Sequence, residues 1–169
     1  MTFRVAGRGS SAISSYQGYY GSFYSSVDQA DGITPIAMAC ENTAENAGVT
    51  MVDNGSGKNT RITFQYAGTY NIQFSCQFHN TGGGGSGTTA NVWFRLNGTD
   101  IPNSDTKVTV NSNSPYVVAA WNFIQTVTAG QYIEIIWYVD NAAIILEQEA
   151  STASHPAIPS VIITAQQIR

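Results

Sequence analysis

Charged residues are scarce in this chain of 169 residues. It has 7 Lys and Arg and 11 Asp and Glu, or 11% of its residues, whereas a soluble domain averages about 25%. A single domain of this size has about 8,000 Å² of folded surface, so the charges are spread thinly. We therefore expect either that hydroxyl and amide groups solvate the surface or that partners cover much of it.

Clustered positive charge and long apolar segments are also lacking. The net charge is −4, and binding to phosphate backbones needs gathered Lys and Arg, so nucleic acid is not an expected partner. No apolar run reaches the roughly 18 residues that span a bilayer, which excludes a membrane partner. The first residues lack the apolar core of a signal peptide, which predicts a protein that is made and kept in a cytosol or is released from one by lysis.

Residues suited to nucleophilic catalysis are few. The two histidines, His79 and His155, lie on the polar side of a strand and in a loop before a proline. Neither setting suits the proton transfer that a serine or cysteine nucleophile requires. Carboxylates for glycoside cleavage exist, but their separation in space cannot be predicted from sequence. We expect no enzyme activity.

Metal and disulfide chemistry have little support. The chain has two cysteines, Cys40 and Cys76, which are too few for a disulfide framework; buried free thiols are expected, with a bridge as the alternative. The cysteines and histidines lack paired zinc-ligand spacing. Asp53 begins a glycine-rich turn that suits an Asx turn or, alternatively, a calcium ion. No cofactor is predicted.

What the sequence does contain is strand-forming residues. Helical periodicity is almost absent, and only residues 145–153 would suit a short helix. Blocks rich in Val, Ile, Thr, Tyr, Phe and Trp alternate with Gly, Asn, Asp, Ser and Pro. We expect an all-β, two-sheet antiparallel sandwich over residues 19–169. About ten strands are predicted, at residues 19–26, 33–39, 49–52, 61–65, 68–79, 90–96, 105–110, 117–127, 132–139 and 160–168.

Three of these strands have informative patterns. Residues 69–79 alternate strictly, so one set of side chains belongs to the core and the other faces outward. Residues 117–124 and 132–139 are apolar on nearly every position. A strand of a sandwich buries one face, so their second apolar face needs a covering loop or another subunit.

Three segments fall outside this pattern. Asn97-Gly98 predicts a tight turn, and residues 81–88 form a glycine-rich loop. Residues 1–18 contain few large apolar groups and are expected to form an arm that becomes ordered only against a partner. The residues of this arm that would contact a partner are Phe3, Arg4, Val5, Arg8, Ile13 and Tyr16.

Several motifs resemble the jelly roll of tumour necrosis factor and the complement globular heads. Residues 68–75, GTYNIQFS, are similar to the family's central inner-sheet strand. Residues 129–135 resemble its turn between two long strands, with Gln131 where the family usually has Asp. Residues 92–104, together with 159–162, resemble tailed-bacteriophage versions of this jelly roll. The resemblance covers about residues 32 to 169.

The resemblance implies a homotrimer whose inner sheets pack around a three-fold axis. This sequence departs from the family by placing amides where relatives have aromatic and aliphatic groups, and we expect hydrogen-bonded rings of Gln73 and Gln77. A solvated face on a monomer is the alternative. The expected interface residues are Asn71, Gln73, Ser75, Gln77, His79, Ala120 and Asn122.

Together these features predict a trimeric structural protein of a phage virion. It would be a capsid decoration or cement protein that binds the major capsid protein, or another virion protein, through the arm. The alternative is the receptor-binding knob of a head fibre or tail fibre. Such a knob would bind a host surface glycan through loops at residues 81–89 and 111–116.

Overall fold

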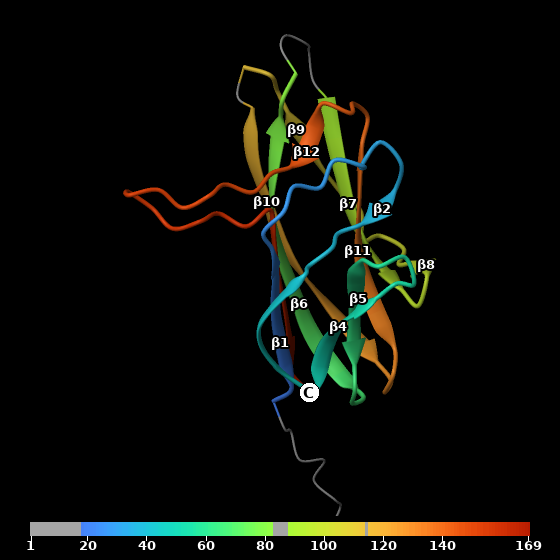
Figure 1. The fold of residues 1–169 in the computed structure, drawn as a ribbon. Helices are drawn as coiled ribbons and strands as arrows, with labels where there is room; N and C mark the ends of the chain where they lie inside the picture. The colour runs from blue at the N-terminus through green and yellow to red at the C-terminus, as the bar shows by residue number, and fades with distance from the viewer. Residues whose placement is uncertain (1–17, 83–87, 114) are drawn as a thin grey trace, which may run out of the picture.

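The chain folds into two antiparallel β-sheets packed face to face (Figure 1). The computed structural model describes residues 18–82, 88–113 and 115–169. These ranges contain thirteen strands and no helix, so they contain no helix that could cross a membrane. Residues 1–17 of the predicted arm, with all six of its named contact residues, and most of the glycine-rich loop lie outside the described residues. The predicted all-β antiparallel sandwich is confirmed.

Sheet A has the order β10-β6-β13-β1-β3, with the short β12 paired to the end of β6. The long pair β10 and β6 is in register over twelve residues, from Tyr116 opposite His79 to Val127 opposite Gly68. β10 therefore forms one edge of the sheet. The strands are β1 (Tyr20–Ser25), β3 (Asn42–Ala47), β6 (Gly68–Asn80), β10 (Tyr116–Val127), β12 (Ile144–Leu146) and β13 (Val161–Gln167).

Sheet B has the order β4-β5-β11-β7-β8, with β2 paired to β11 and β9 paired to β7. The turn from β7 to β8 is the predicted Asn97-Gly98, whose φ angles of 47° and 82° are the left-handed values of a tight hairpin turn. The strands are β2 (Ile36–Ala37), β4 (Val49–Asp53), β5 (Asn59–Phe64), β7 (Thr88–Leu96), β8 (Thr99–Asp100), β9 (Thr106–Val110) and β11 (Tyr132–Val139).

The core lies between the two sheets and is rich in aromatic side chains. In β6 the alternation holds as predicted, with Tyr70, Ile72, Phe74, Cys76 and Phe78 all buried. Aromatic contacts then join the sheets, because Phe74 of sheet A lies 5.9 Å from Phe94 of sheet B, measured between ring centroids. Offset and edge-to-face contacts of this kind stabilise a core beyond their buried area.

The two strands with apolar residues on both faces differ in how far the folded chain buries them. Every residue from Ile133 to Trp137 in β11 is buried within the single chain, and Ile136 is 0% exposed. The second apolar face of this strand, for which a covering loop or another subunit was expected, is covered by the chain itself. In β10, by contrast, Val118 and Ile124 remain 59% and 57% exposed.

Three short strands were not predicted from the sequence: β3, β8 and β12. Five of the six residues of β3 are exposed, since the strand lies at the edge of sheet A. It therefore lacks the alternating apolar residues that signal a strand. The predicted strand at residues 33–39 shortens to the two residues of β2. The segment that most suited a helix forms β12 and the hairpin after it.

Candidate functional site

The outward face of β10, β6 and β13 is the candidate functional site, and we call it the A face. These three strands contain no Asp, Glu, Lys or Arg at any position. Their outward side chains are Tyr116, Val118, Ala120, Asn122 and Ile124 of β10, Asn71, Gln73, Ser75, Gln77 and His79 of β6, and Ile162, Thr164 and Gln166 of β13.

All seven residues predicted for the trimer interface lie on the A face. Ala120 is opposite Ser75, and Asn122 is opposite Gln73, in the antiparallel pairing of β10 with β6. The amides also bond to one another across the strands, because Asn122 Nδ2 donates to Asn71 Oδ1 at 3.2 Å. The structure thus gathers the predicted residues into one continuous patch.

Large apolar side chains that were not among the predicted interface residues border these amides. Val118 and Ile124 are on one flank, Ile162 lies on the other at 39% exposure, and Tyr116 sits at the end of the patch. Tyr116, Val118 and Ile124 share the outward parity of Ala120 and Asn122 on β10, whereas Ile162 joins them through the pairing of β13 with β6. The A face is therefore partly apolar.

The A face is hollowed in two places. One hollow of about 220 Å³ is lined by Gln73, Phe74, Ala120, Trp121 and Asn122. The other, of about 320 Å³, lies between β6, β13 and β1. Hollows of this size can each receive a side chain from an opposing surface, which is how interfaces reach the packing density of protein interiors.

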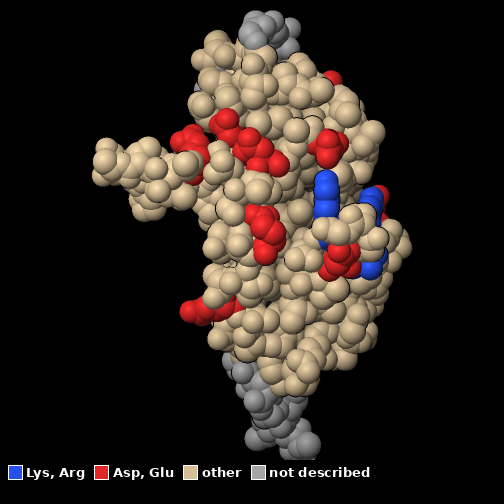
Figure 2. All heavy atoms as spheres, viewed as in Figure 1, with Lys and Arg blue, Asp and Glu red and all other residues tan. Residues whose placement is uncertain are grey.

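Charged groups lie around the A face or on sheet B. Lys58, Arg61, Arg95 and Lys107 all belong to sheet B or its turns. Figure 2 shows Lys and Arg gathered on one side of the molecule, with acidic residues spread over the surface toward the projecting hairpin. An uncharged, partly apolar patch bordered by charge is typical of a protein interface.

One end of the A face carries a titratable cluster. His79 Nδ1 lies 2.9 Å from Glu147 Oε1, and both side chains are largely buried. The Tyr116 ring stacks on His79 with 4.3 Å between centroids and 13° between planes. Partial desolvation, and then the negative charges of Glu147 and Glu149, raise the pKa of Tyr116. This cluster closes the A face where β12 meets β6.

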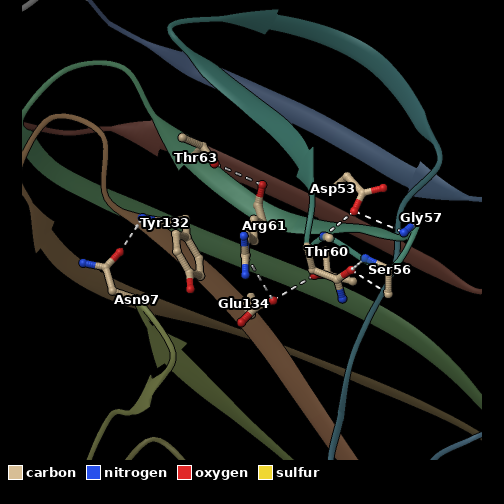
Figure 3. A network of polar contacts seen from close by, with 11 residues as sticks. Asp53, Ser56, Gly57, Thr60, Arg61, Thr63, Asn97, Tyr132 and Glu134 are labelled. Atoms are coloured by element: carbon tan, nitrogen blue, oxygen red, sulfur yellow. Dashed lines mark hydrogen bonds and ion pairs between the residues drawn. The ribbon is translucent and has the colours of Figure 1, made fainter.

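Sheet B holds a buried carboxylate, Glu134, which Figure 3 shows with its neighbours. Its Oε1 accepts a 2.8 Å hydrogen bond from Thr60 Oγ1, and Arg61 Nε lies 4.0 Å away. The Arg61 guanidinium stacks over the Tyr132 ring, 4.6 Å from its centroid. In the nearby turn Asp53 accepts backbone hydrogen bonds from Gly55 and Gly57, which is the expected Asx turn. This network stabilises sheet B.

A third hollow lies on sheet B, around Trp93. It has a volume of about 260 Å³ and is lined by Trp93, Asp100, Ile101, Asn103 and Asp105. Hydrogen bonds from Trp93 Nε1 and Arg95 Nε to Asp100 Oδ1, both 2.8 Å, hold the pKa of Asp100 below its ordinary value. An aromatic ring can stack on a sugar, and neighbouring carboxylate and amide oxygens can accept hydrogen bonds from the hydroxyls of the sugar.

The two cysteines belong to the core and not to a site. Cys40 and Cys76 are both buried and unbridged, as expected. Burial raises the pKa of both thiols. In the described part of the chain, no three His, Cys, Asp or Glu side chains are grouped so that they could hold a metal ion.

Comparison with known proteins identifies the fold. The structure is similar to the crystal structure of murine APRIL at pH 5.0, with a TM-score of 0.56, 8% sequence identity, and coverage of 90% of this chain and 100% of that one. No protein-family model matches the sequence, and no curated protein matches it significantly. The chain therefore has the TNF-like jelly-roll fold, and at this identity the likeness concerns the fold alone.

Proposed function

We propose that this chain is a trimeric structural protein of a phage virion. In it, three copies pack their A faces around a common axis, with Gln73 and Gln77 of each copy bonded to those of its neighbours. The trimer decorates or cements the capsid, and residues 1–18 bind the major capsid protein or another virion protein. The function is structural and involves no catalysis and no cofactor.

The A face is the observation that carries this proposal. Val118 and Ile124 are more than half exposed on strands without a single charged residue. Burying one such side chain stabilises an assembly by about 1.5–3 kcal/mol. A TNF-like fold is compatible with a trimeric head, and the two hollows offer sites where side chains of a neighbour can insert.

The molecular mass in solution tests the trimer. Multi-angle light scattering at micromolar concentration is expected to give three times the 18.1 kDa mass of the chain. A monomeric mass would contradict the proposal. The copy number per virion tests the location, because hundreds of copies indicate a capsid protein and tens or fewer indicate a fibre or tail component.

Deletion of residues 2–18 tests the arm. The truncated chain is expected to remain a trimer but to lose binding to capsids in a sedimentation assay. The full-length chain serves as the control in the same assay. Undiminished capsid binding by the truncated trimer would contradict the role of the arm.

The Trp93 hollow favours a second candidate, a receptor-binding knob that recognises a host glycan. Its lining differs from the loops expected from the sequence, since it lies on sheet B beside β8. Glycan-array binding that is lost in Trp93→Ala would favour the knob. Absence of binding to any glycan or host cell would contradict it.

A further inference from the structure

A hairpin of residues 147–159 projects from the side of sheet A. It joins β12 to β13, and both strands pair with β6 of that sheet. Figures 1 and 2 show it extending away from the body of the sandwich, on the side opposite sheet B. Residues 150–157 are exposed along its length. The hairpin therefore offers surface to something other than its own domain.

The base of the hairpin is fixed to sheet A. Glu147 N donates to Gln77 O, and Gln77 N donates to Ser160 O, both at 2.9 Å. Gln148 N adds a 2.8 Å bond to Asp28 Oδ1. These bonds come from both arms of the hairpin, so the sheet sets the direction in which it projects.

Beyond its base, the hairpin is held by its own backbone. Glu149 and Ile158 exchange two hydrogen bonds of 2.9 Å, and Thr152 N donates to His155 O at 3.0 Å. A two-stranded hairpin of this kind is only marginally stable in water. Residues 150–160 contain no Asp, Glu, Lys or Arg, and depletion of charge is typical of surfaces that become covered.

The height of the hairpin along the strands of sheet A indicates which residues of a neighbouring copy it would contact. In β12, Ile145 pairs with His79 and Leu146 with Phe78. On the other side of β6, Tyr116 pairs with His79 and Val118 with Gln77. The base of the hairpin and these two exposed side chains of β10 therefore lie at one level of sheet A.

We propose that the hairpin of each copy straps a second copy of this chain, lying against the neighbour's Tyr116 and Val118. The inference rests on the trimer proposed above. Rotation about an axis that runs along the strands leaves the height of each residue along that axis unchanged. A hairpin that projects from one copy therefore reaches the next copy at the same height as the base of the hairpin. There Tyr116 and Val118 are 58% and 59% exposed and offer an apolar surface to it.

Site-specific photo-crosslinking of the full chain tests this contact. A benzophenone amino acid replaces Ala153 near the tip, and in a matched control it replaces Ser56, which is exposed in the turn between β4 and β5. After irradiation, the variant at Ala153 is expected to give two-chain and three-chain species on a denaturing gel. Mass spectrometry is expected to place the link within residues 116–127 of the neighbour. The Ser56 variant is expected to stay at the one-chain position.

A shortened hairpin gives a second measurement. Replacing residues 150–157 by Asn-Gly keeps the Glu149–Ile158 pair and supplies a tight turn. The trimer of this variant is expected to dissociate at a protein concentration at least about tenfold higher than the full chain requires, since several interface contacts are lost.

The outcomes separate the hairpin from the trimer. A full chain that is trimeric by mass, but gives no link between chains from position 153, overturns the strap and leaves the proposed trimer standing. Links to another part of the neighbour, or unchanged dissociation of the shortened variant, overturn it as well. A monomeric full chain overturns both proposals.

Discussion

At the residue scale, Glu134 shows how the few charges of this chain are accommodated. Glu134 is 7% exposed, and its carboxylate accepts a hydrogen bond from the Thr60 hydroxyl, whereas Arg61 Nε is 4.0 Å away. A buried carboxylate that loses such a donor keeps its full cost of desolvation. The stability of sheet B should therefore depend on an uncharged hydroxyl group.

Replacing Thr60 by the isosteric valine tests this dependence. Thr60→Val is expected to lower the free energy of unfolding by about 1.5–3 kcal/mol, the range for hydrogen bonds to charged groups. Urea denaturation monitored by circular dichroism measures the loss. Thr63→Val is the control, because its hydroxyl makes a 3.4 Å contact with the Arg61 carbonyl and should contribute less than about 1 kcal/mol. Equal losses in the two variants would contradict the role of Thr60.

Asp100 gives a prediction for the dependence of stability on pH. The hydrogen bonds from Trp93 and Arg95 lower its pKa in the folded protein below the ordinary value of 3.8. The folded state thus favours the ionised carboxylate, and this contribution is present above about pH 4 and lost as the pH falls through the folded pKa. Because the side chain is 58% exposed, the contribution should be less than about 1 kcal/mol.

Asp100→Asn is accordingly expected to be less stable than the natural chain near pH 7 and equally stable near pH 2. Urea unfolding of both proteins at the two pH values measures the difference. A gap in stability that persists unchanged at the lower pH would show that ionisation of Asp100 is not its cause.

At the element scale, β6 and β10 contrast in how much the sequence predicts. The strict alternation of β6 predicted both its buried set and its outward amides, since one side chain in two must enter the core. β10 and β11 look alike in sequence, yet the chain covers both faces of β11 and leaves the outer face of β10 open. Position within a sheet decides this difference, and it arises from tertiary pairing that local pattern does not encode.

The candidate site was predicted only in part for the same reason. Its β6 residues follow from alternation, but the apolar flanks from Val118, Ile124 and Ile162 require the register of three strands. The hairpin at residues 147–159 could not be predicted, because its small and polar residues carry no periodic signal.

The exposed apolar flank of β10 gives a prediction for assembly. Val118→Asp introduces a carboxylate into the A face of every copy, and burying an unpaired charge costs several kcal/mol. The variant is expected to be a folded monomer by light scattering and circular dichroism. Val52→Asp is the matched control, because Val52 is 41% exposed on β4 of sheet B, and this variant should remain a trimer. Trimeric Val118→Asp would place the interface elsewhere.

At the scale of the whole molecule, charge is partitioned between the two sheets. The central strands of sheet A have none, while four of the described cations lie on sheet B or its turns. An assembly through the A face would therefore be held by apolar burial and amide hydrogen bonds, with little electrostatic attraction between copies.

The response to salt tests this partition. The dissociation constant of the trimer is expected to change by less than about threefold between about 0.05 and 0.5 M sodium chloride, because screening acts on charges that the A face lacks. Sedimentation equilibrium at several salt concentrations measures it. Steep weakening with salt would instead indicate an interface through the charged groups of sheet B.

The strand order of sheet A also determines when the sheet can be completed during synthesis. β13 lies between β6 and β1, and its residues 161–167 follow the other twelve described strands in the sequence. During synthesis, sheet A thus lacks an interior strand until residue 167 has been translated, and β1 has no neighbour on that side. The A face is therefore incomplete until β13 has paired with β6, because β13 supplies Ile162, Thr164 and Gln166 to it.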